Sequence, residues 1–226
     1  MDDQTLYDIQ AVFARILKGD SAAVFDLASQ NERPTLQKAF NYAAERHKGQ
    51  MRKGALQRPY TDHLLMTWYL VRASGGSLEQ QQAALLHDVV EDCRKKDETR
   101  SDIIKEIENI FQRPVSQLVE GLTLPFDNED DAKELEIISK MPKEVKLIKA
   151  CDNAANLWDS IFDRPQHWSE DRYKYVIQFR EHVNKLTAID GSIEDAIFKD
   201  FIKMATENAK PDASQRERPQ CPKPKI

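Results

Sequence analysis

The sequence is poor in glycine and cysteine and has no long apolar run, and each shortage excludes a class of protein. Its 226 residues include only 7 glycines and 3 cysteines. Cys93, Cys151 and Cys221 are odd in number and widely spaced, which argues against a disulfide framework and against a zinc ribbon. No apolar run approaches the roughly 18 residues of a membrane span, and the acidic start lacks a hydrophobic signal core. We therefore expect a cytoplasmic protein that has no membrane partner.

The chain also lacks an excess of positive charge. It has 33 Lys and Arg against 38 Asp and Glu, which gives a formal net charge of −5. An acidic chain is a poor candidate for a general nucleic-acid coat, so we expect no duplex nucleic acid as a partner. A local basic patch could still bind a small anionic molecule.

Helical periodicity is the main pattern that remains, because strand-like alternation is scarce. Low glycine and 31% charged residues also favour helix. We predict an all-α bundle in which residues 1–33 form an N-terminal helical extension, 34–208 the domain, and 209–226 a disordered polar tail. Helices are expected as two short segments before 34 and then at about 34–46, 62–73, 78–93, 103–110, from Pro114, from Pro142, 168–188 and 192–208, with an acidic loop at 125–131.

One string in the predicted 78–93 helix carries four polar groups. His87 and Asp88 are adjacent, and Glu91 and Asp92 follow one helical turn later. Core packing gives no reason for this pattern, since burying unpaired carboxylates is costly and a cation would offset that cost. A His–Asp dipeptide alone is at least as often a surface pair, so further ligands must come from elsewhere in the chain.

Two other polar residues interrupt apolar helical segments. His63 lies near the start of a predicted helix, and Asp152 lies within the helix that follows Pro142. With His87 and Asp88 they make a set of two histidines and two carboxylates. Such a set suits manganese, iron or zinc better than calcium, and it leaves coordination positions open for water and substrate.

A segregated basic segment precedes His63. Residues 46–58 contain no acidic residue and include Arg46, His47, Lys48, Arg52, Lys53 and Arg58. Charge runs are usually solvated loops. The alternative is an anion clamp, because arginine pairs with phosphate oxygens in fork geometry and stacks on a base. A patch of this size fits one nucleotide, and it is too small for a duplex.

Four strings in this order resemble the hydrolase domain of the RelA/SpoT homologues, and more narrowly a single-domain small alarmone hydrolase. They are His-Lys-Gly-Gln-Met-Arg-Lys at 47–53, Pro-Tyr-Thr-Asp-His at 59–63, Leu-His-Asp-Val-Val-Glu-Asp at 86–92 and Lys-Ala-Cys-Asp-Asn-Ala-Ala-Asn at 149–156. The resemblance implies an HD-domain helical fold and one divalent metal ion, usually manganese. It implies that His63, His87, Asp88 and Asp152 are the ligands.

The resemblance also implies an activity and further roles. The family reaction removes pyrophosphate from the 3′ position of (p)ppGpp and gives GDP or GTP. By analogy, Glu91 and Asp92 position and activate the attacking water. Arg52 and Lys53 pack along the base and neutralise phosphate, and Asn156 lines the nucleotide pocket.

The chain departs from the family pattern near the expected base clamp. Five residues, Gly54 to Arg58, separate Lys53 from Pro59, where the usual string has three. Leu64 follows His63 where the family commonly has a proline, and Asn153 follows Asp152 where the family commonly has an arginine. Base identity therefore stays open, with (p)ppApp or the 2′-phosphate of NADPH as alternative substrates. A catalytically silent nucleotide-binding or antitoxin-like protein is the alternative from another class. The sequence does not reveal the oligomeric state.

Overall fold

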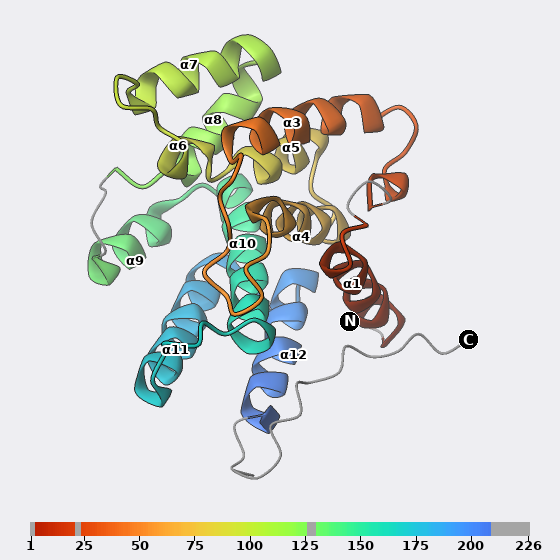
Figure 1. The fold of residues 1–226 in the computed structure, drawn as a ribbon, viewed down its shortest axis with the longest axis vertical. Coiled ribbons are helices and arrows are strands. Elements are labelled where there is room, and N and C mark those ends of the chain that lie inside the picture. Colours follow the sequence, from red (N-terminus) through yellow and green to blue (C-terminus); the bar gives the residue numbers. More distant parts are fainter. Residues whose placement is uncertain (1–2, 21–23, 126–129, 209–226) are drawn as a thin grey trace.

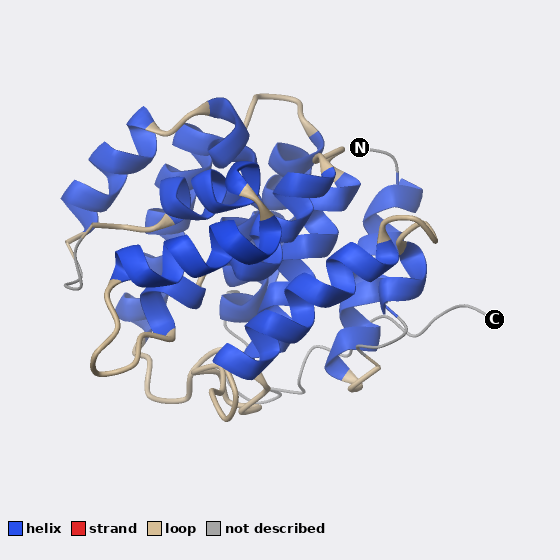
Figure 2. Ribbon diagram, turned by 90° about the horizontal axis from the view of Figure 1, so that it is seen from above, coloured by secondary structure: helices blue, strands red, loops and turns tan. Residues whose placement is uncertain are grey.

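The computed structural model describes residues 3–20, 24–125 and 130–208. Its regular elements in these ranges are helices, beside one isolated antiparallel bridge between Met51 and Pro59 (Figure 2). The predicted all-α fold is confirmed. No helix in the described ranges has both the length and the apolarity needed to cross a bilayer. In chain order the elements are α1 (Asp3–Leu17), the 3-10 helix η1 (Phe25–Leu27), α3 (Arg33–Arg46), α4 (Tyr60–Ala73), α5 (Leu78–Leu86), α6 (Val89–Asp92), α7 (Arg100–Phe111), α8 (Arg113–Leu122), α9 (Asp131–Lys140), α10 (Lys143–Phe162), α11 (Glu170–Thr187) and α12 (Ile193–Asn208).

Helix α10 forms the centre of the bundle, with α4, α5, α8, α11 and α12 packed around it (Figure 1). Its residues 150–155 are all buried. A helix enclosed on every side is normally apolar all round. The buried Asp152, Asn153 and Asp159 of α10 must therefore find polar or ionic partners on neighbouring elements.

The N-terminal helix α1 packs into the same core. The fully buried ring of Phe13 lies 5.4 Å from the ring of Trp158 in edge-on geometry and 6.3 Å from that of Phe201. Aromatic pairs at these separations are favourable beyond the area that they bury. The described part of residues 1–33 thus contributes to the core around α10. A domain boundary at residue 34 stays a prediction, and the predicted tail at 209–226 lies outside the described residues.

Several helix starts follow from local sequence signals. Helix α3 has Pro34 in its first turn, where a missing N–H costs nothing. Helix α5 begins with a capping box, in which the Ser77 hydroxyl accepts from the Gln80 N–H and the Gln80 side chain accepts from the Ser77 N–H. Serine is among the preferred N-cap residues, so this helix start follows from the local sequence.

The prediction of one continuous helix over 78–93 is wrong. Helix α5 ends at Leu86, and the short α6 begins at Val89. Between them, the Asp88 backbone has φ −91° and ψ −6°, which lies in the sparsely populated bridge region. The His87–Asp88 pair thus lies at a bend between two helices and not on the face of one helix.

Two other helices differ from the sequence prediction. Helix α9 was not predicted, because its apolar Leu135 and Ile138 lie in a run of charged residues. The side chain of Asp130 caps it by accepting from the Lys133 N–H, so the predicted acidic loop ends one residue early; residues 126–129 of that loop lie outside the described ranges. In the described part of residues 1–33, α1 is longer than the predicted short helix and a 3-10 turn lies at Phe25–Leu27; residues 21–23, where the second predicted helix would lie, are outside the described ranges.

Candidate metal centre and adjoining cleft

Three separate elements bring the four predicted metal ligands together. His63 lies in the first turn of α4, His87 and Asp88 form the bend between α5 and α6, and Asp152 lies in the middle of α10. Helices α4, α5 and α10 pack against one another, so these positions meet at the centre of the bundle. The fold therefore gathers side chains that are up to 89 residues apart in the sequence.

The ligand atoms of this group converge on one point. His87 Nε2 lies 2.9 Å from Asp88 Oδ2 and 3.6 Å from Asp152 Oδ1. His63 Nε2 lies 3.2 Å from the same Asp152 oxygen and 3.6 Å from Asp88 Oδ2. His63, His87 and Asp88 together meet the geometry of a site that could hold a metal ion. Asp152 Oδ1 faces both histidines and supplies a fourth donor atom.

The hydrogen bonding of His87 supports a ligand role. Its Nδ1 lies 2.8 Å from the carbonyl oxygen of Ala84, and because a carbonyl can only accept, Nδ1 must carry the proton. Nε2 therefore faces the carboxylates, and it can act as a ligand when a metal ion takes the place of its proton. This buried Nε2 makes no directed hydrogen bond within the described residues. A buried imidazole nitrogen that faces two carboxylates without a directed hydrogen bond fits a site for a cation, and the donor set suits a transition metal.

The charges in this group are strongly coupled. Burial alone would lower the pKa of His87, but Asp88 and Asp152 raise it well above its usual value. Burial would raise the pKa of Asp88, but His87 holds it below its usual value. Burial, and next the nearby Arg52, lower the pKa of His63. Two ionised carboxylates thus face the imidazoles, and the group attracts positive charge to the point where its ligand atoms meet.

Two residues that the sequence analysis did not single out orient the carboxylates. Tyr60 Oη donates to Asp88 Oδ2 at 2.7 Å, and Lys149 Nζ donates to Asp152 Oδ2 at 3.1 Å. The Lys149 bond engages Oδ2, whereas Asp152 Oδ1 faces the histidines and accepts a hydrogen bond from Asn156 Nδ2 at 2.5 Å. Lys149 could have been found from its spacing, because it lies three residues before Asp152 on the same helix face. Tyr60 carries no comparable signal in the sequence.

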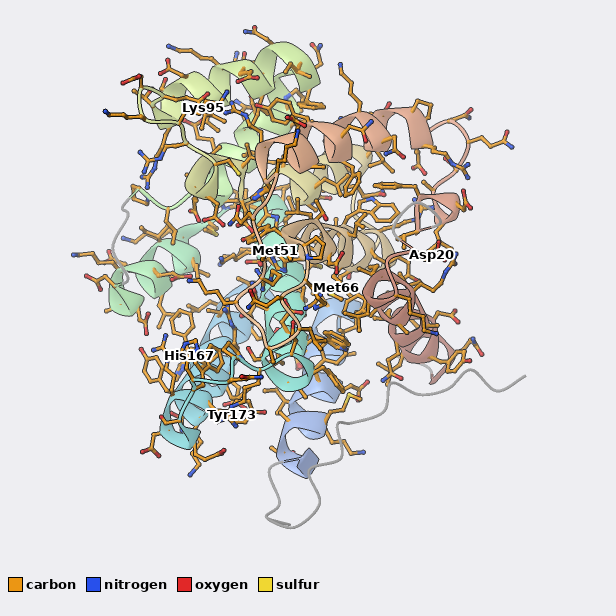
Figure 3. All side chains as sticks on the ribbon, viewed as in Figure 1. Asp20, Met51, Met66, Lys95, His167 and Tyr173 are labelled. Carbon is orange, nitrogen blue, oxygen red and sulfur yellow. The ribbon has the colours of Figure 1, made fainter. Side chains whose placement is uncertain are left out.

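A cavity of about 450 Å³ adjoins the metal centre. Asp88 joins the two, and the predicted Glu91, Asp92, Arg52, Lys53 and Asn156 all line the cavity. The loop between α3 and α4 closes one side of it, and Met51, labelled in Figure 3, marks this loop where it crosses α10. The cavity is large enough to hold part of a nucleotide.

Glu91 and Asp92 lie on the α6 side of this cavity. Glu91 accepts a hydrogen bond from the Leu124 N–H at 2.5 Å, and Asp92 accepts one from the Gln50 side chain at 2.9 Å. Burial raises the pKa of Glu91 to about 6. A carboxyl group with this pKa is ionised at neutral pH and can still accept a proton effectively. The geometry is therefore compatible with a base at Glu91.

Arg52 and Asn156 meet on the opposite side of the cavity. Arg52 Nη2 donates to Asn156 Oδ1 at 2.7 Å, and its Nε donates to Asp159 Oδ2 at 2.9 Å. The guanidinium carbon lies 5.2 Å from the centre of the Tyr60 ring. The side chain of Lys53 is exposed at the rim, and it has no ion-pair partner among the described residues. Arg52 is fixed in place, whereas Lys53 is free to meet an anion.

The basic segment 46–58 does not form a single clamp. Arg46 pairs with Glu98 at 2.8 Å and with Glu106 at 2.6 Å, away from the cavity. Arg58 is buried and donates from Nε to Asp163 at 2.9 Å. Arg46 and Arg58 therefore take no part in an anion clamp, because distant acidic residues already neutralise these two arginines. Only Arg52 and Lys53 of this segment line the cavity as cations.

The helical fold and the His–Asp centre are those of the HD-domain class, and comparison with known proteins agrees. The sequence profile described as "HD domain" matches residues 39–157. The chain therefore belongs to the HD domain family. A solved structure described as a metazoan ortholog of SpoT that hydrolyses ppGpp superposes with a TM-score of 0.66 at 24% identity, over 74% of this chain and 93% of the other. This match supports the fold.

Within the family, the chain is similar to proteins named guanosine-3′,5′-bis(diphosphate) 3′-pyrophosphohydrolase MESH1. The relative from Xenopus tropicalis is 35% identical over 153 residues, which cover 65% of this chain and 81% of the relative. The relative from Danio rerio is 30% identical over 170 residues, which cover 72% of this chain and 90% of the relative. The predicted resemblance to RelA/SpoT-type hydrolases is thus confirmed.

Proposed function

We propose that the chain is a metal-dependent hydrolase that removes pyrophosphate from the 3′ position of guanosine-3′,5′-bis(diphosphate) and its triphosphate form, giving GDP or GTP. The main support is the convergence of His63, His87, Asp88 and Asp152 beside a cavity that Arg52 also lines. The names of the MESH1 relatives support the choice of substrate.

In this proposal, His63, His87, Asp88 and Asp152 hold one divalent ion, with manganese as our candidate. Such an ion lowers the pKa of an attacking water and offsets the charge of the phosphate under attack. Lys149 contributes by holding Asp152 through Oδ2, so that Oδ1 stays directed at the ligand point. A cytoplasmic location and the exclusion of duplex nucleic acid stay predictions alongside the identity of the metal.

The protein residues then position water and substrate. Water attacks the phosphorus nearest the ribose, the bond from this phosphorus to the 3′-oxygen breaks, and the 3′-oxygen takes up a proton as pyrophosphate is released. Glu91 and Asp92 hold the water, and Glu91 accepts its proton. Arg52 and Asn156 hold the nucleoside, with Arg52 offering its planar face to the base and Lys53 meeting phosphate from the rim.

A panel of nucleotides tests this proposal. The manganese-loaded protein is incubated separately with ppGpp, ppApp and NADPH, and released pyrophosphate and orthophosphate are measured separately. We expect pyrophosphate from ppGpp, and none from an Asp88→Asn variant under the same conditions. Release of pyrophosphate from ppApp alone would show that ppApp is the substrate instead of ppGpp. Release of orthophosphate from NADPH alone would show that NADPH is the substrate. Bound metal without turnover of any nucleotide would make the chain a silent binding protein.

A further inference from the structure

The cavity beside the metal centre contains more negative than positive charge. Five carboxylates line it, and the three cationic side chains among its lining residues are Arg52, Lys53 and Arg180. A nucleotide with two diphosphate groups is itself strongly anionic, so binding it here requires cations that are not already neutralised. Arg52 is not such a free cation, because Asp159 already pairs with it: Asp159 Oδ2 lies 2.8 Å from Arg52 Nη2.

Arg180 enters the cavity from helix α11 and has no acidic partner. Among the described residues, no carboxylate oxygen lies within ion-pair distance of its guanidinium, and its buried Nε has no hydrogen-bond partner. Its Nη1 reaches only the amide oxygen of Asn153, at 3.5 Å. Burial lowers its pKa, yet an arginine in a protein stays charged. The Arg180 side chain is half-buried, and its buried Nε has no partner within the described ranges, so leaving this guanidinium without an anion is costly.

Arg180 comes from a different helix than the predicted metal ligands. Asn153, which it contacts, follows the ligand Asp152 in α10 and is turned about 100° away from it around the helix axis. Asn153 Nδ2 also donates to the Arg180 backbone oxygen at 2.9 Å, which ties this part of α11 to α10. Arg180 therefore approaches the cavity from α11, whereas His63, His87 and Asp88 approach from α4 and the α5–α6 bend.

We propose that Arg180 binds the 5′-diphosphate of the nucleotide, which is the diphosphate that the reaction leaves in place. This inference rests on the proposed function for the identity of the ligand. The metal centre receives the 3′ group and Arg52 meets the base, so the unpaired guanidinium on the α11 side is the cation that remains inside the cavity. Its fork of N–H donors matches adjacent phosphate oxygens.

Binding of GDP and of guanosine tests the role of Arg180 without turnover. Isothermal titration of the manganese-loaded protein with each compound reports the contribution of the 5′-diphosphate directly. We expect Arg180→Gln to weaken GDP binding about tenfold or more and to leave guanosine binding unchanged. The matched control is Lys174→Gln, which removes one charge from an exposed position on the same helix and should change neither affinity.

The fold of the variant is checked by thermal unfolding. The bond from Asn153 to the Arg180 backbone persists in Arg180→Gln, so we expect little change in Tm. If this variant unfolds, Arg180→Lys replaces it, because lysine keeps the charge but loses the paired donors and should weaken GDP binding roughly threefold. Unchanged GDP affinity in the folded variant, or equal losses for GDP and guanosine, would overturn the inference.

Turnover by the wild-type protein separates this inference from the proposed function. If wild type releases no pyrophosphate from ppGpp but Arg180→Gln still weakens GDP binding selectively, the proposed function fails and the Arg180 site stands. If wild type turns over ppGpp and GDP binding is the same in both proteins, the proposed function stands and the Arg180 site fails.

Discussion

Helix α10 carries two buried polar clusters that differ in how completely their charges are paired. In the cluster around Asp159 and Asp163, Asp159 accepts from Arg52 and Arg58, and Asp163 accepts from Arg58 and from the Leu56 N–H. In the cluster around Asp152, Asp88 faces imidazoles and the Tyr60 hydroxyl without an arginine or lysine partner, and His87 Nε2 has no directed hydrogen bond among the described residues. In the same described part of the chain, the first cluster leaves only Arg58 Nη1 without a directed hydrogen bond. The paired cluster fastens the α3–α4 loop to the bundle, whereas the unpaired cluster is arranged to receive a ligand.

The largest expected effect comes from breaking the unpaired cluster. Asp88→Ala or His87→Ala should abolish binding of manganese and lower turnover by about a thousandfold or more, because the activating ion is lost. Without metal, each change also removes one partner of a buried ionic group and should lower Tm, so the variants are compared with wild type below the lowered Tm. Metal analysis after dialysis, the rate of pyrophosphate release and Tm without metal check the three expectations. Manganese-dependent activity in either variant would refute the ligand assignment.

Breaking the paired cluster should lower stability and leave manganese binding intact. Arg58→Ala leaves Asp159 and Asp163 short of their buried partner and should lower the free energy of unfolding by about 3–5 kcal/mol. Below the lowered Tm, the protein should still bind manganese. Urea unfolding measures the loss, with the exposed Arg113→Ala as a control that should change stability by less than about 0.5 kcal/mol. Equal stability of the two variants would show that the cluster does not fasten the loop.

A smaller effect is expected from Glu91, which lies between metal centre and cavity. Glu91→Gln should lower kcat about a hundredfold by removing the base. Burial raises the pKa of Glu91 to about 6, and only its ionised form accepts a proton. The kcat/KM of wild type should therefore fall as pH drops through about 6, and this acidic limb should vanish in the variant. Glu120→Gln, at an exposed position, should keep the wild-type profile.

The smallest of these effects concerns Arg52, which belongs to both the paired cluster and the cavity. Arg52→Ala should raise KM for ppGpp about tenfold and keep manganese bound, because it removes a contact to the nucleotide and no metal ligand. Arg52→Lys should recover only part of the loss, since lysine lacks the planar fork. Steady-state kinetics measures KM for each variant, and metal analysis in parallel measures bound manganese. An unchanged KM in Arg52→Ala would count against a role of Arg52 in substrate binding.

The sequence predicted the unpaired cluster better than the paired one. Asp152 lies in an otherwise apolar helix, and such a residue has a local signal because burial without a partner is costly. The pairing of Arg58 with Asp163 has no such signal. The two residues are 105 positions apart, and each is ordinary in its own charged segment. Charge composition alone therefore did not separate the three arginines of the basic segment. In the fold, Arg46 pairs with Glu98, Arg58 pairs with Asp163, and Arg52 lines the cavity.

Backbone detail and isolated cavity residues were also beyond the sequence. The bend at Asp88 depends on one residue leaving helical geometry, and the apolar pattern of 78–93 is the same with or without it. Helix α9 was missed since its few apolar residues are dispersed among charges. Arg180 lies in the charged helix α11, where an arginine is normally solvated, so only the packing of α11 against α10 reveals that it is half-buried and lines the cavity.

The central claim is that His63, His87, Asp88 and Asp152 hold one metal ion at one point. The most direct measurement is anomalous diffraction at the manganese edge from crystals of the protein soaked with manganese. We expect a single strong peak within about 2.3 Å of His63 Nε2, His87 Nε2 and one oxygen from each carboxylate. No peak at this point, or a peak that leaves His63 or Asp152 uncoordinated, would contradict the account.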